Sequence, residues 1–411
     1  MTEQSTATVI GGGIAGLASA TALVRAGWRV TVLERAADFT EVGAGVAITR
    51  NGMAALAALG ADEPVWAAGH LTRTAGSQNR RGRWVLRFPD VPVEQSPATW
   101  LCAVHRRRLH AALLQTAGDA RLVNGARVTS VEPGAAGGAP ARVTWTSAEG
   151  EQTIESDLVV AADGVHSTAR ARLFPGVRAE YAGATSWRAV IEDTEIVDDR
   201  YIAVWGPGME FGALRISATE VYWYGYFLAP AHTVFDDELA AAREMFAGWP
   251  ATVTATLAAT GADDLMRHDV HHLPGGLPTY VSGRVVTAGD AAHAILPTVG
   301  QGVAGALEDA ACVGRLIAQP VAAGAALAPT LAAYDLARRP RCRKVARQAI
   351  TMARIGSHLG GGWRQPVRDA LLRLVPTGRF AGSGLAGRLV GWTPPPAPAL
   401  ATIQPPPSRP Y

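Results

Sequence analysis

Three glycines near the start of the chain have the spacing that a nucleotide phosphate requires. Gly11, Gly13 and Gly16 follow a short apolar run, residues 7–10, and lead into a helix-like segment, residues 14–27. The first glycine permits a tight turn, the second lets the backbone approach a pyrophosphate, and the third permits close helix–strand packing. Free N–H groups at the start of the helix attract phosphate oxygens. We therefore expect a dinucleotide to bind here.

An acidic residue completes this pattern at the end of the next strand-like run, residues 29–33. Glu34 lies 18 residues after Gly16 and can accept hydrogen bonds from the hydroxyls of an adenosine ribose. A 2′-phosphate at that position would be repelled. The strand–helix–strand unit predicts a right-handed parallel crossover. The complete pattern predicts a dinucleotide with a free ribose, and it leaves open the choice between FAD and NAD.

A second motif, GDAAHAILPTVGQG, begins at Gly289 and favours a flavin. A predicted strand, residues 284–288, leads into Asp290, which can bind a ribityl hydroxyl. Gly300 and Gly302 allow backbone N–H groups to lie against a flat ring. The helix that follows would point its N-terminus at the flavin N1/C2 carbonyl edge, where negative charge develops when the flavin is reduced.

A third motif, DLVVAADGVHSTAR, occupies residues 157–170. In this order and spacing, the three motifs resemble those of the single-component FAD-dependent aromatic hydroxylases, which include p-hydroxybenzoate and salicylate hydroxylases. The resemblance covers roughly residues 7–345. It implies an α/β fold with a Rossmann-like FAD-binding domain, a mainly antiparallel β-sheet substrate domain and C-terminal helices.

The same resemblance implies a reaction. NADPH or NADH, bound transiently, would reduce FAD, and the reduced flavin would react with O2 to give a C4a-hydroperoxide. That species would hydroxylate a small aromatic or polyketide-like molecule. Water must be excluded from such a site, because the hydroperoxide otherwise decays to H2O2.

The resemblance also assigns roles to individual residues. Pro297 and Gly300 would border the flavin C4a position and count as catalytic. Arg106 would touch FAD, although its neighbours Arg107 and Arg108 leave that choice open by one residue. The positions implied to bind the cofactor are Gly11, Gly13, Ala15, Gly16, Glu34, Arg35, Gly45, Val46, Arg106, Asp163, Gly164, Asp290, Pro297, Gly300, Gly302 and Val303.

Aromatic-rich segments between residues 181 and 227 predict an antiparallel sheet that covers the flavin. Side chains alternate along a strand, so Tyr222, Tyr224 and Tyr226 should share one face, with Trp223 on the other. Arg188 and Tyr224 are candidate catalytic residues. Arg188 would bind a carboxylate or phenolate, or else form a salt bridge, and the aromatic rings would line a pocket or only pack the sheet.

Bulk composition narrows the class of protein. The chain has 411 residues, with 38 basic and 35 acidic side chains and a net charge of +3. So small a net charge predicts neither a nucleic-acid nor a membrane partner. Three widely spaced cysteines predict no disulfide framework and no metal site. With no signal peptide and no membrane span recognised, we expect a cytoplasmic monomer or homodimer.

The predicted organisation divides the chain into four parts. Within it, we expect a loop and then a helix over residues 40–60, and a helix over residues 103–118. The parts are a discontinuous FAD-binding domain (1–75, 100–180 and 268–345), a substrate-binding sheet domain (76–99 and 181–267), a C-terminal helical segment (346–392) and a Pro-rich tail (393–411).

Several alternatives remain open on this scaffold. An epoxidising, Baeyer–Villiger or other FAD oxidoreductase would share the three motifs, as would a non-catalytic FAD-binding protein. A halogenase is disfavoured because the chain has no W-x-W-x-I-P stretch. A disulfide reductase is disfavoured because the chain has neither a second G-x-G-x-x-G after a strand nor a C-x-x-C.

Overall fold

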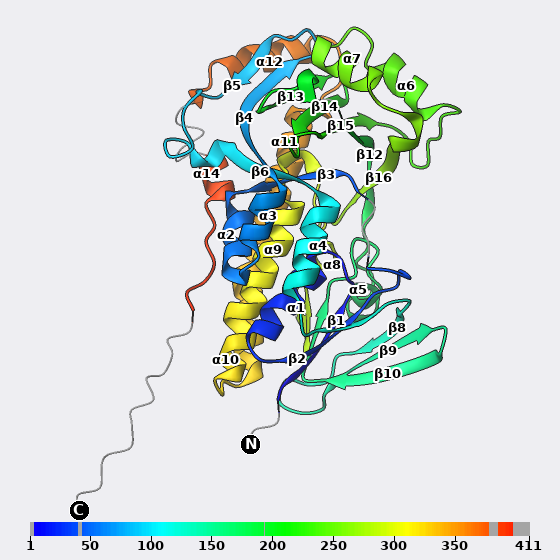
Figure 1. The fold of residues 1–411 in the computed structure, drawn as a ribbon, viewed down its shortest axis with the longest axis vertical. Helices are drawn as coiled ribbons and strands as arrows, with labels where there is room; N and C mark the ends of the chain where they lie inside the picture. Colours follow the sequence, from blue (N-terminus) through cyan, green and yellow to red (C-terminus); the bar gives the residue numbers. More distant parts are fainter. Residues whose placement is uncertain (1–3, 40–42, 193, 378–384, 398–411) are drawn as a thin grey trace, which may run out of the picture.

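A parallel sheet forms the lower part of the molecule in Figure 1. The computed structural model describes residues 4–39, 43–192, 194–377 and 385–397. The strand order is β17-β18-β11-β1-β2-β7, and only the β17–β18 pair is antiparallel. Helix α1 (Ile14–Arg25) joins β1 to β2, which confirms the predicted strand–helix–strand unit. The strands are β1 (Thr6–Ile10), β2 (Arg29–Leu33), β7 (Arg121–Val123), β11 (Leu158–Ala161), β17 (Val281–Ser282) and β18 (Val285–Thr287).

A larger sheet of nine strands forms the upper part. Its order is β16-β12-β15-β14-β13-β4-β6-β3, with β5 paired to β4. All neighbours are antiparallel except β13 and β4, so the predicted mainly antiparallel sheet is confirmed. The strands are β3 (Gly45–Thr49), β4 (His70–Asn79), β5 (Trp84–Arg87), β6 (Trp100–His105), β12 (Glu180–Ile191), β13 (Arg200–Gly206), β14 (Met209–Arg215), β15 (Val221–Leu228) and β16 (Met266–His272).

Helices cover both sheets, and a small antiparallel sheet flanks the parallel one. The small sheet contains β8 (Arg127–Glu132), β9 (Ala141–Ser147) and β10 (Gly150–Ser156). The remaining α-helices are α2 (Arg50–Leu59), α3 (Asp62–Ala68), α4 (Arg106–Thr116), α5 (Thr168–Leu173), α6 (Glu238–Met245), α7 (Ala251–Ala258), α8 (Asp290–His293), α9 (Gly302–Cys312), α10 (Gln319–Ala322), α11 (Leu327–Ile355), α12 (Arg364–Arg373) and α14 (Leu385–Val390). No helix in these described ranges is long and apolar enough to cross a membrane.

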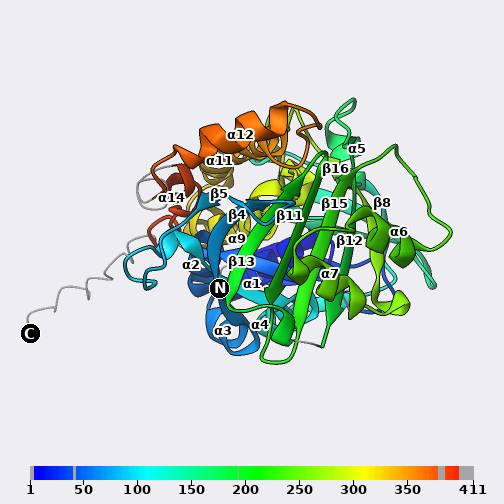
Figure 2. The ribbon, with the colours of Figure 1, turned by 90° about the horizontal axis from the view of Figure 1, so that it is seen from above.

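The two faces of the nine-stranded sheet differ in what they contact. On the outer face, Trp187, Phe211 and Trp223 pack with side chains of α6 and α7, which lie over the sheet in Figures 1 and 2. Tyr222 and Tyr224 lie on the opposite face and pack toward β3 and β6. The predicted alternation of the tyrosines with Trp223 is therefore confirmed, and the tyrosine face is turned toward the rest of the molecule.

Two local predictions were wrong for one physical reason. The helix expected over residues 103–118 begins only at Arg106, and residues 100–105 form β6. Within the expected loop, residues 45–49 form β3, whereas residues 40–42 lie outside the described residues. Both segments pair with strands distant in sequence, because β6 pairs with β3 and β4. Such pairing overrides the conformation that the local sequence favours.

Strands from several predicted parts meet in this sheet. β3, β6 and most of β4 come from ranges predicted for the FAD-binding domain, yet they pair in the nine-stranded sheet. The division of the chain into domains stays a prediction. In the C-terminal part, α11 continues to Ile355 and α12 and α14 follow. Residues 378–384, in the expected helical segment, lie outside the described ranges. Residues 398–411, which make up most of the expected tail, lie outside them too.

Candidate functional site

The first glycine motif leaves no room for a side chain at Gly11 or Gly16. Gly11 has a φ of +99°, and a Cβ on it would lie 2.5 Å from the carbonyl oxygen of Ala162. A Cβ on Gly16 would lie 1.9 Å from the carbonyl oxygen of Gly11. Helix α1 begins directly after Gly13, and no side chain caps its first turn. The turn therefore presents free N–H groups where a pyrophosphate would lie.

Glu34 lies at the mouth of this turn. Its carboxylate accepts hydrogen bonds from the backbone N–H groups of Gly12, at 2.7 Å, and Ala36, at 2.8 Å. The adjacent Arg35 is exposed. His110 was missed by sequence reasoning, although its Nε2 donates to the carbonyl oxygen of Gly12 at 2.7 Å. The histidine lies within α4, far along the chain, and no local motif marks it.

The second motif packs directly onto the first. Gly289 has a φ of +60°, and a Cβ there would lie 2.7 Å from the Cβ of Ala15, in the first turn of α1. This contact brings Asp290, the exposed first residue of α8, beside the predicted phosphate site. The structure thus brings together Ala15 and Asp290, which the sequence separates widely.

The Asp-Gly motif organises the loop after β11. Asp163 accepts hydrogen bonds from the hydroxyl of Ser167, the N-cap of α5, and from the backbone N–H of Ala169 in its first turn. Gly164 follows with a φ of +79°. Arg170 is only 3% exposed and donates to the carbonyl oxygen of Ala291 at 3.1 Å. The motif therefore connects the loops that follow β11 and β18.

The predicted flavin-edge segments also meet. Pro297 begins a short 3-10 turn, Gly300 has a φ of +60°, and α9 begins at Gly302 without a side-chain cap. Gln301 Nε2 donates to Thr49 Oγ1 at 2.9 Å, at the end of β3. Val46 and Val303 pack against the same core cluster. The Gly45 strand and the start of α9 thus lie side by side.

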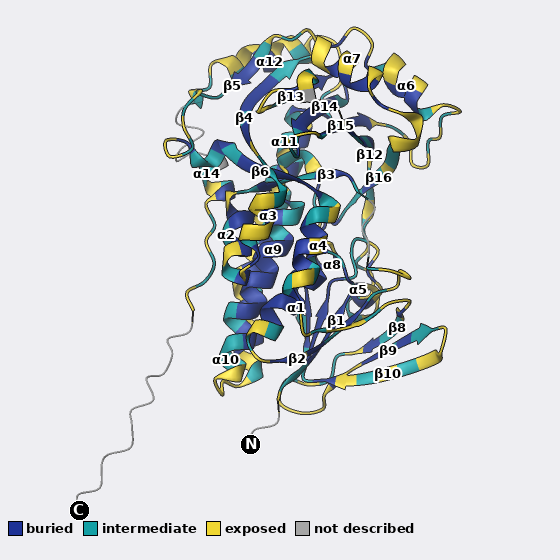
Figure 3. Ribbon diagram, viewed as in Figure 1, coloured by how far each residue is buried: buried dark blue, intermediate teal, exposed yellow. Residues whose placement is uncertain are grey.

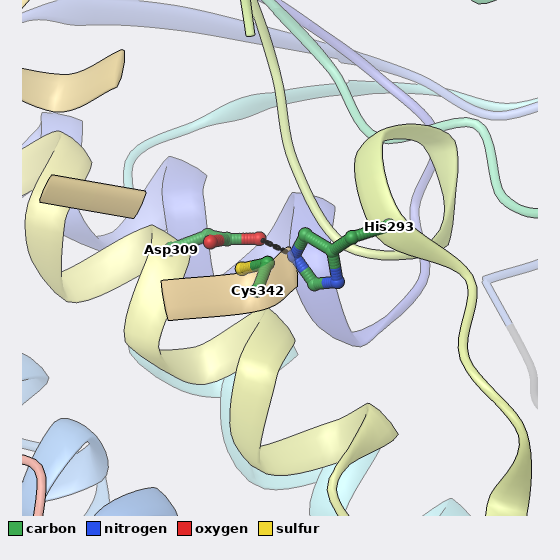
Figure 4. A group of neighbouring side chains, drawn as sticks. All are labelled: His293, Asp309 and Cys342. Atoms are coloured by element: carbon green, nitrogen blue, oxygen red, sulfur yellow. Dashed lines mark hydrogen bonds and ion pairs between the residues drawn. The ribbon is translucent and has the colours of Figure 1, made fainter. Parts of the chain in front are cut away.

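A buried charged cluster lies beneath these loops (Figure 4). It consists of His293, Glu308, Asp309 and Arg338, all at most 6% exposed, and Figure 4 draws His293 and Asp309 together with Cys342. Asp309 Oδ2 accepts from His293 Nε2 at 2.5 Å and from Gly289 N–H at 2.8 Å. Arg338 donates to Asp309 Oδ1 and to Glu308 Oε2, both at 2.6 Å. The charged cluster therefore anchors the residue that precedes Asp290.

Opposite charges outweigh burial within this cluster. Burial alone raises the pKa of Asp309, but His293 and Arg338 hold that pKa below its ordinary value. Burial alone lowers the pKa of His293, whereas Asp309 and Cys342 raise it well above the usual range. Cys342 lies beside both (Figure 4), and Arg338 Nη2 approaches its sulfur to 3.4 Å. His293, Asp309 and Cys342 could together bind a metal ion. The guanidinium of Arg338, however, already supplies the positive charge that such an ion would bring to these side chains.

The tyrosine face of the large sheet rests on the flavin-edge segments. A Cβ on Gly45 would lie 2.4 Å from the Cβ of Tyr222. Tyr226 packs in one cluster with Leu296, which precedes Pro297. Arg188, on β12, pairs across the strands with Tyr224 on β15. The predicted catalytic residues of the sheet therefore share the face that meets the flavin loops.

Two arginines from different elements lie close enough to Tyr222 and His268 on this face to affect both pKa values. Arg188 comes from β12 and Arg106 from the start of α4. Burial raises the pKa of Tyr222, while Arg188 and Arg106 act against that rise. Burial lowers the pKa of His268, and both arginines lower it further. Arg188 Nε is buried and has no hydrogen-bond partner among the described residues.

The arginines next to Arg106 are placed differently. Arg107 is exposed, and Arg108 forms an ion pair of 2.6 Å with Glu220. The backbone N–H of Arg106 donates to Ala44, next to Gly45. This placement favours Arg106 over its two neighbours as the arginine that would contact FAD, and that contact stays a prediction.

A second buried polar group surrounds Tyr224. Its hydroxyl donates to Glu210 Oε1 at 2.5 Å and accepts from the Tyr201 hydroxyl at 2.6 Å. Trp205 Nε1 donates to the other oxygen of Glu210 at 3.1 Å. Burial raises the pKa of Glu210 to about 6, against the effect of these hydrogen bonds. We call Tyr201, Trp205, Glu210 and Tyr224 the Glu210 cluster, and no sequence motif predicted it.

Comparisons with known proteins agree with this geometry. Residues 4–349 match the family model described as FAD binding domain. The chain is 33% identical over 381 residues to aurachin C monooxygenase/isomerase of Stigmatella aurantiaca, covering 91% of this chain and 95% of that protein. It is 30% identical over 387 residues to 2-heptyl-3-hydroxy-4(1H)-quinolone synthase of Pseudomonas aeruginosa, covering 90% and 94%.

A solved structure extends the agreement to three dimensions. Klebsiella pneumoniae HpxO, complexed with FAD and uric acid, superposes with a TM-score of 0.82 at 28% identity, covering 95% of this chain and 97% of that one. The uncapped helix starts and the close-packed glycines described above suit the same cofactor. The chain therefore belongs to the FAD binding domain family and is an FAD-dependent monooxygenase of aromatic substrates.

Proposed function

We propose that this enzyme uses NAD(P)H and O2 to hydroxylate a nitrogen-containing heteroaromatic compound that carries a ring oxygen substituent. Two similar proteins support this class, because one is named for a quinolone and the other binds uric acid. The observation that carries the proposal is the position of Arg188. It is a half-buried cation with an unpartnered Nε, on the sheet face that meets the flavin loops.

The residues that would hold FAD include those of the first and second motifs. The N-terminus of α1 and Glu34 would bind the pyrophosphate and the adenosine ribose, and Asp290 would bind the ribityl chain. The N-terminus of α9 would lie at the pyrimidine edge of the flavin. When bound and reduced by NAD(P)H, FAD would activate O2, which provides the oxygen atom added to the substrate.

The protein's own contribution is to orient the substrate and exclude water. Arg188 and Arg106 would favour the deprotonated form of a hydroxyl on the substrate ring. The negative charge on that oxygen makes the adjacent ring carbon more nucleophilic. With its pKa lowered, His268 is neutral near neutral pH and adds no charge of its own. Tyr224 is a positioning residue in this proposal, because Glu210 and Tyr201 hold its hydroxyl in place.

A substrate panel tests the proposal. Quinolones, hydroxypyridines and purine-like heterocycles would be compared with phenols for stimulation of NADH and NADPH oxidation. Mass analysis would look for products one oxygen atom heavier than the substrate, and NMR would separate a hydroxylated ring from an epoxide or a ring-expanded product. Absence of stimulation by every heterocycle, or a preference for carbocyclic phenols, would contradict the proposal.

Variants of Arg188 connect the activity to the geometry. Arg188→Met should raise the KM for substrate at least about tenfold, because a charge-assisted hydrogen bond is lost. Bound flavin should keep its absorbance, and Arg188→Lys should restore part of the affinity. The matched control is Arg200→Met, which removes an exposed arginine that is paired with Asp198 at the start of β13. Equal KM values for Arg188→Met and the control would exclude Arg188 from substrate binding.

A further inference from the structure

Helix α12 exposes its apolar side chains along one side. Trp363, Val367, Leu371 and Leu374 are spaced by four, four and three residues, so they form a single stripe on the helix. Trp363 is 73% exposed, Leu371 62% and Leu374 79%. Figure 3 shows exposed residues along this helix, at the end of the molecule farthest from the parallel sheet. Scattered exposed leucines are common, but a continuous stripe marks an interaction surface.

The stripe borders a groove of about 350 Å3 between the end of α11 and α12. Ile355 and Leu359 line the side opposite the stripe. The inner side of α12 contacts the rest of the protein, since Arg368 donates to the carbonyl oxygen of Ile355 at 3.3 Å and Asp369 accepts from Asn79 at 2.8 Å. The apolar stripe on the other side of α12 therefore stays exposed and borders the groove.

Positive charge surrounds this stripe. The adjacent hairpin of β4 and β5 lies beside α12 in both ribbon views, and Arg373 Nε donates to the carbonyl oxygen of Trp84. Residues 70–87 and 354–377 together contain nine arginines and a single acidic residue, the buried Asp369. The exposed arginines of this region are Arg80, Arg81, Arg83, Arg87, Arg354, Arg364 and Arg373.

None of these seven exposed arginines has an ion-pair partner among the residues that the structure describes. Over the whole chain, by contrast, 38 basic side chains are balanced by 35 acidic ones. This region therefore carries an excess of positive charge, which the small net charge of the whole chain does not reveal. We call the stripe and these arginines the basic apolar surface.

We propose that the basic apolar surface docks onto an anionic lipid bilayer, with α12 lying in the plane of the interface. Apolar side chains on one side and arginines along the flanks are the pattern of helices that bind at membrane surfaces. Tryptophan is favoured at that depth, and each arginine near the surface is attracted by anionic headgroups. A second copy of the chain fits poorly, because a symmetric contact would bring the arginines of both copies together.

This proposal departs from the expectation drawn from net charge, which predicted no membrane partner. Net charge averages over the whole surface, whereas docking depends on the charges within a Debye length of the membrane. No membrane-spanning helix is needed, since the contact is peripheral.

Flotation with lipid vesicles tests the proposal. The FAD-loaded enzyme would be mixed with vesicles of phosphatidylcholine alone, or of phosphatidylcholine with phosphatidylglycerol, at low and at high salt. We expect flotation with the anionic vesicles only, and less of it at high salt because exposed charges are screened. Absence of flotation with the anionic vesicles, or equal flotation with both, would overturn the proposal.

Two double variants separate the apolar from the charged contribution. Leu371→Ser with Leu374→Ser should weaken partitioning at least about tenfold, through lost burial of apolar surface. Arg364→Glu with Arg373→Glu should weaken it by roughly fivefold for each arginine, or more. All four side chains are exposed, so bound flavin and turnover should not change.

Matched controls lie on other surfaces. Leu336→Ser removes a leucine that is 74% exposed on α11, and Arg127→Glu reverses an exposed arginine on β8. Neither should change vesicle binding. If the controls weaken flotation as much as the double variants do, the attraction is a property of overall charge, and the docking surface is refuted.

Discussion

The charged cluster and the Glu210 cluster are both buried, yet they handle a buried carboxylate in opposite ways. In the first, Asp309 faces the cations Arg338 and His293, which keep its pKa low. In the second, Glu210 is 7% exposed, and within the described part of the chain its carboxylate accepts hydrogen bonds from the hydroxyl of Tyr224 and the indole N–H of Trp205 but from no cation. Burial then dominates, and the pKa of Glu210 rises to about 6.

The difference matches what each region must do. The charged cluster anchors the loop that carries Asp290, and paired charges keep that loop in one arrangement across the physiological pH range. The Glu210 cluster lies in the sheet that would face the substrate, where a carboxyl near its titration point can change charge. We therefore expect the charged cluster to keep its charges across that pH range, whereas the Glu210 cluster should change charge near pH 6.

Arg338→Met should produce the largest effect, by breaking the first cluster. Glu308 and Asp309 would lose their shared cation, and an uncompensated buried charge costs about 3–5 kcal/mol of unfolding free energy. Because Asp309 also holds Gly289, flavin should dissociate at lower denaturant concentration. Denaturant unfolding followed by flavin fluorescence measures both effects.

The neighbouring Arg339 provides the control for that variant. It pairs with Asp335 at 3.1 Å on the same helix, and both side chains are partly exposed. Arg339→Met should cost only about 0.3–0.5 kcal/mol. Equal costs for the two variants would show that the charged cluster has no special structural role.

Glu210→Gln should remove a pH dependence of stability. The pKa of Glu210 is raised from 4.5 in the unfolded chain to about 6 in the folded one, so the folded state retains its proton longer. The wild type should therefore lose about 2 kcal/mol of stability as the pH rises from about 4.5 to about 6. In Glu210→Gln, that loss should be absent.

Glu220, whose pKa is shifted in the opposite direction, provides a control for the sign of this pH dependence. Burial raises the pKa of Glu220, but Arg108 and Ser217 outweigh burial and hold the pKa below its ordinary value. Its stabilisation is present above the unfolded pKa and is lost as the pH falls. Glu220→Gln should therefore flatten the acid side of the profile and leave the slope that belongs to Glu210 intact. Unfolding free energies measured across this pH range for the three proteins decide between these outcomes.

The sequence predicted the parts of the cofactor site that depend on local geometry. Gly16 is required by its close contact with Gly11 in the same turn, and Gly11 adopts a positive φ in that turn, so the local spacing identifies the motif even though Gly11 also approaches Ala162. Asp290 follows a buried strand and precedes a glycine-rich loop, which is also a local pattern. The contact of Gly289 with Ala15 could not be predicted in detail, because it depends on how α8 packs against α1.

The parts that sequence reasoning missed depend on distant pairing. Glu210 and Tyr224 meet because β14 and β15 pair in one particular register, and a shift of one strand by one residue would place the two side chains on opposite faces. Arg338 reaches Asp309 between two different helices, α11 and α9. Neither relation leaves a periodic signal, so predicting either would require knowledge of the packed fold.

Tyr224→Phe should have a smaller effect, on the Glu210 cluster alone. The variant removes one donor to a buried carboxylate and leaves the Tyr201 hydroxyl without its acceptor, at a cost of about 1–3 kcal/mol. The hydrogen bond from Tyr224 opposes the effect of burial on Glu210, so its loss should raise the pKa of Glu210 further. The pH at which stability declines should then move upward, and an unchanged or lower transition would contradict this account.

Tyr201→Phe gives the smallest expected effect and separates the two tyrosines. Tyr201 donates to Tyr224 and has no hydrogen bond to Glu210 within the described residues. Its loss should cost about 0.5–1.5 kcal/mol, the ordinary value of one hydrogen bond. The pH profile should keep the wild-type midpoint, because Tyr224 still donates to the carboxylate. If Tyr201→Phe shifts the midpoint as far as Tyr224→Phe does, the two hydroxyls act on Glu210 as one unit, and the order of donors inferred from the geometry is wrong.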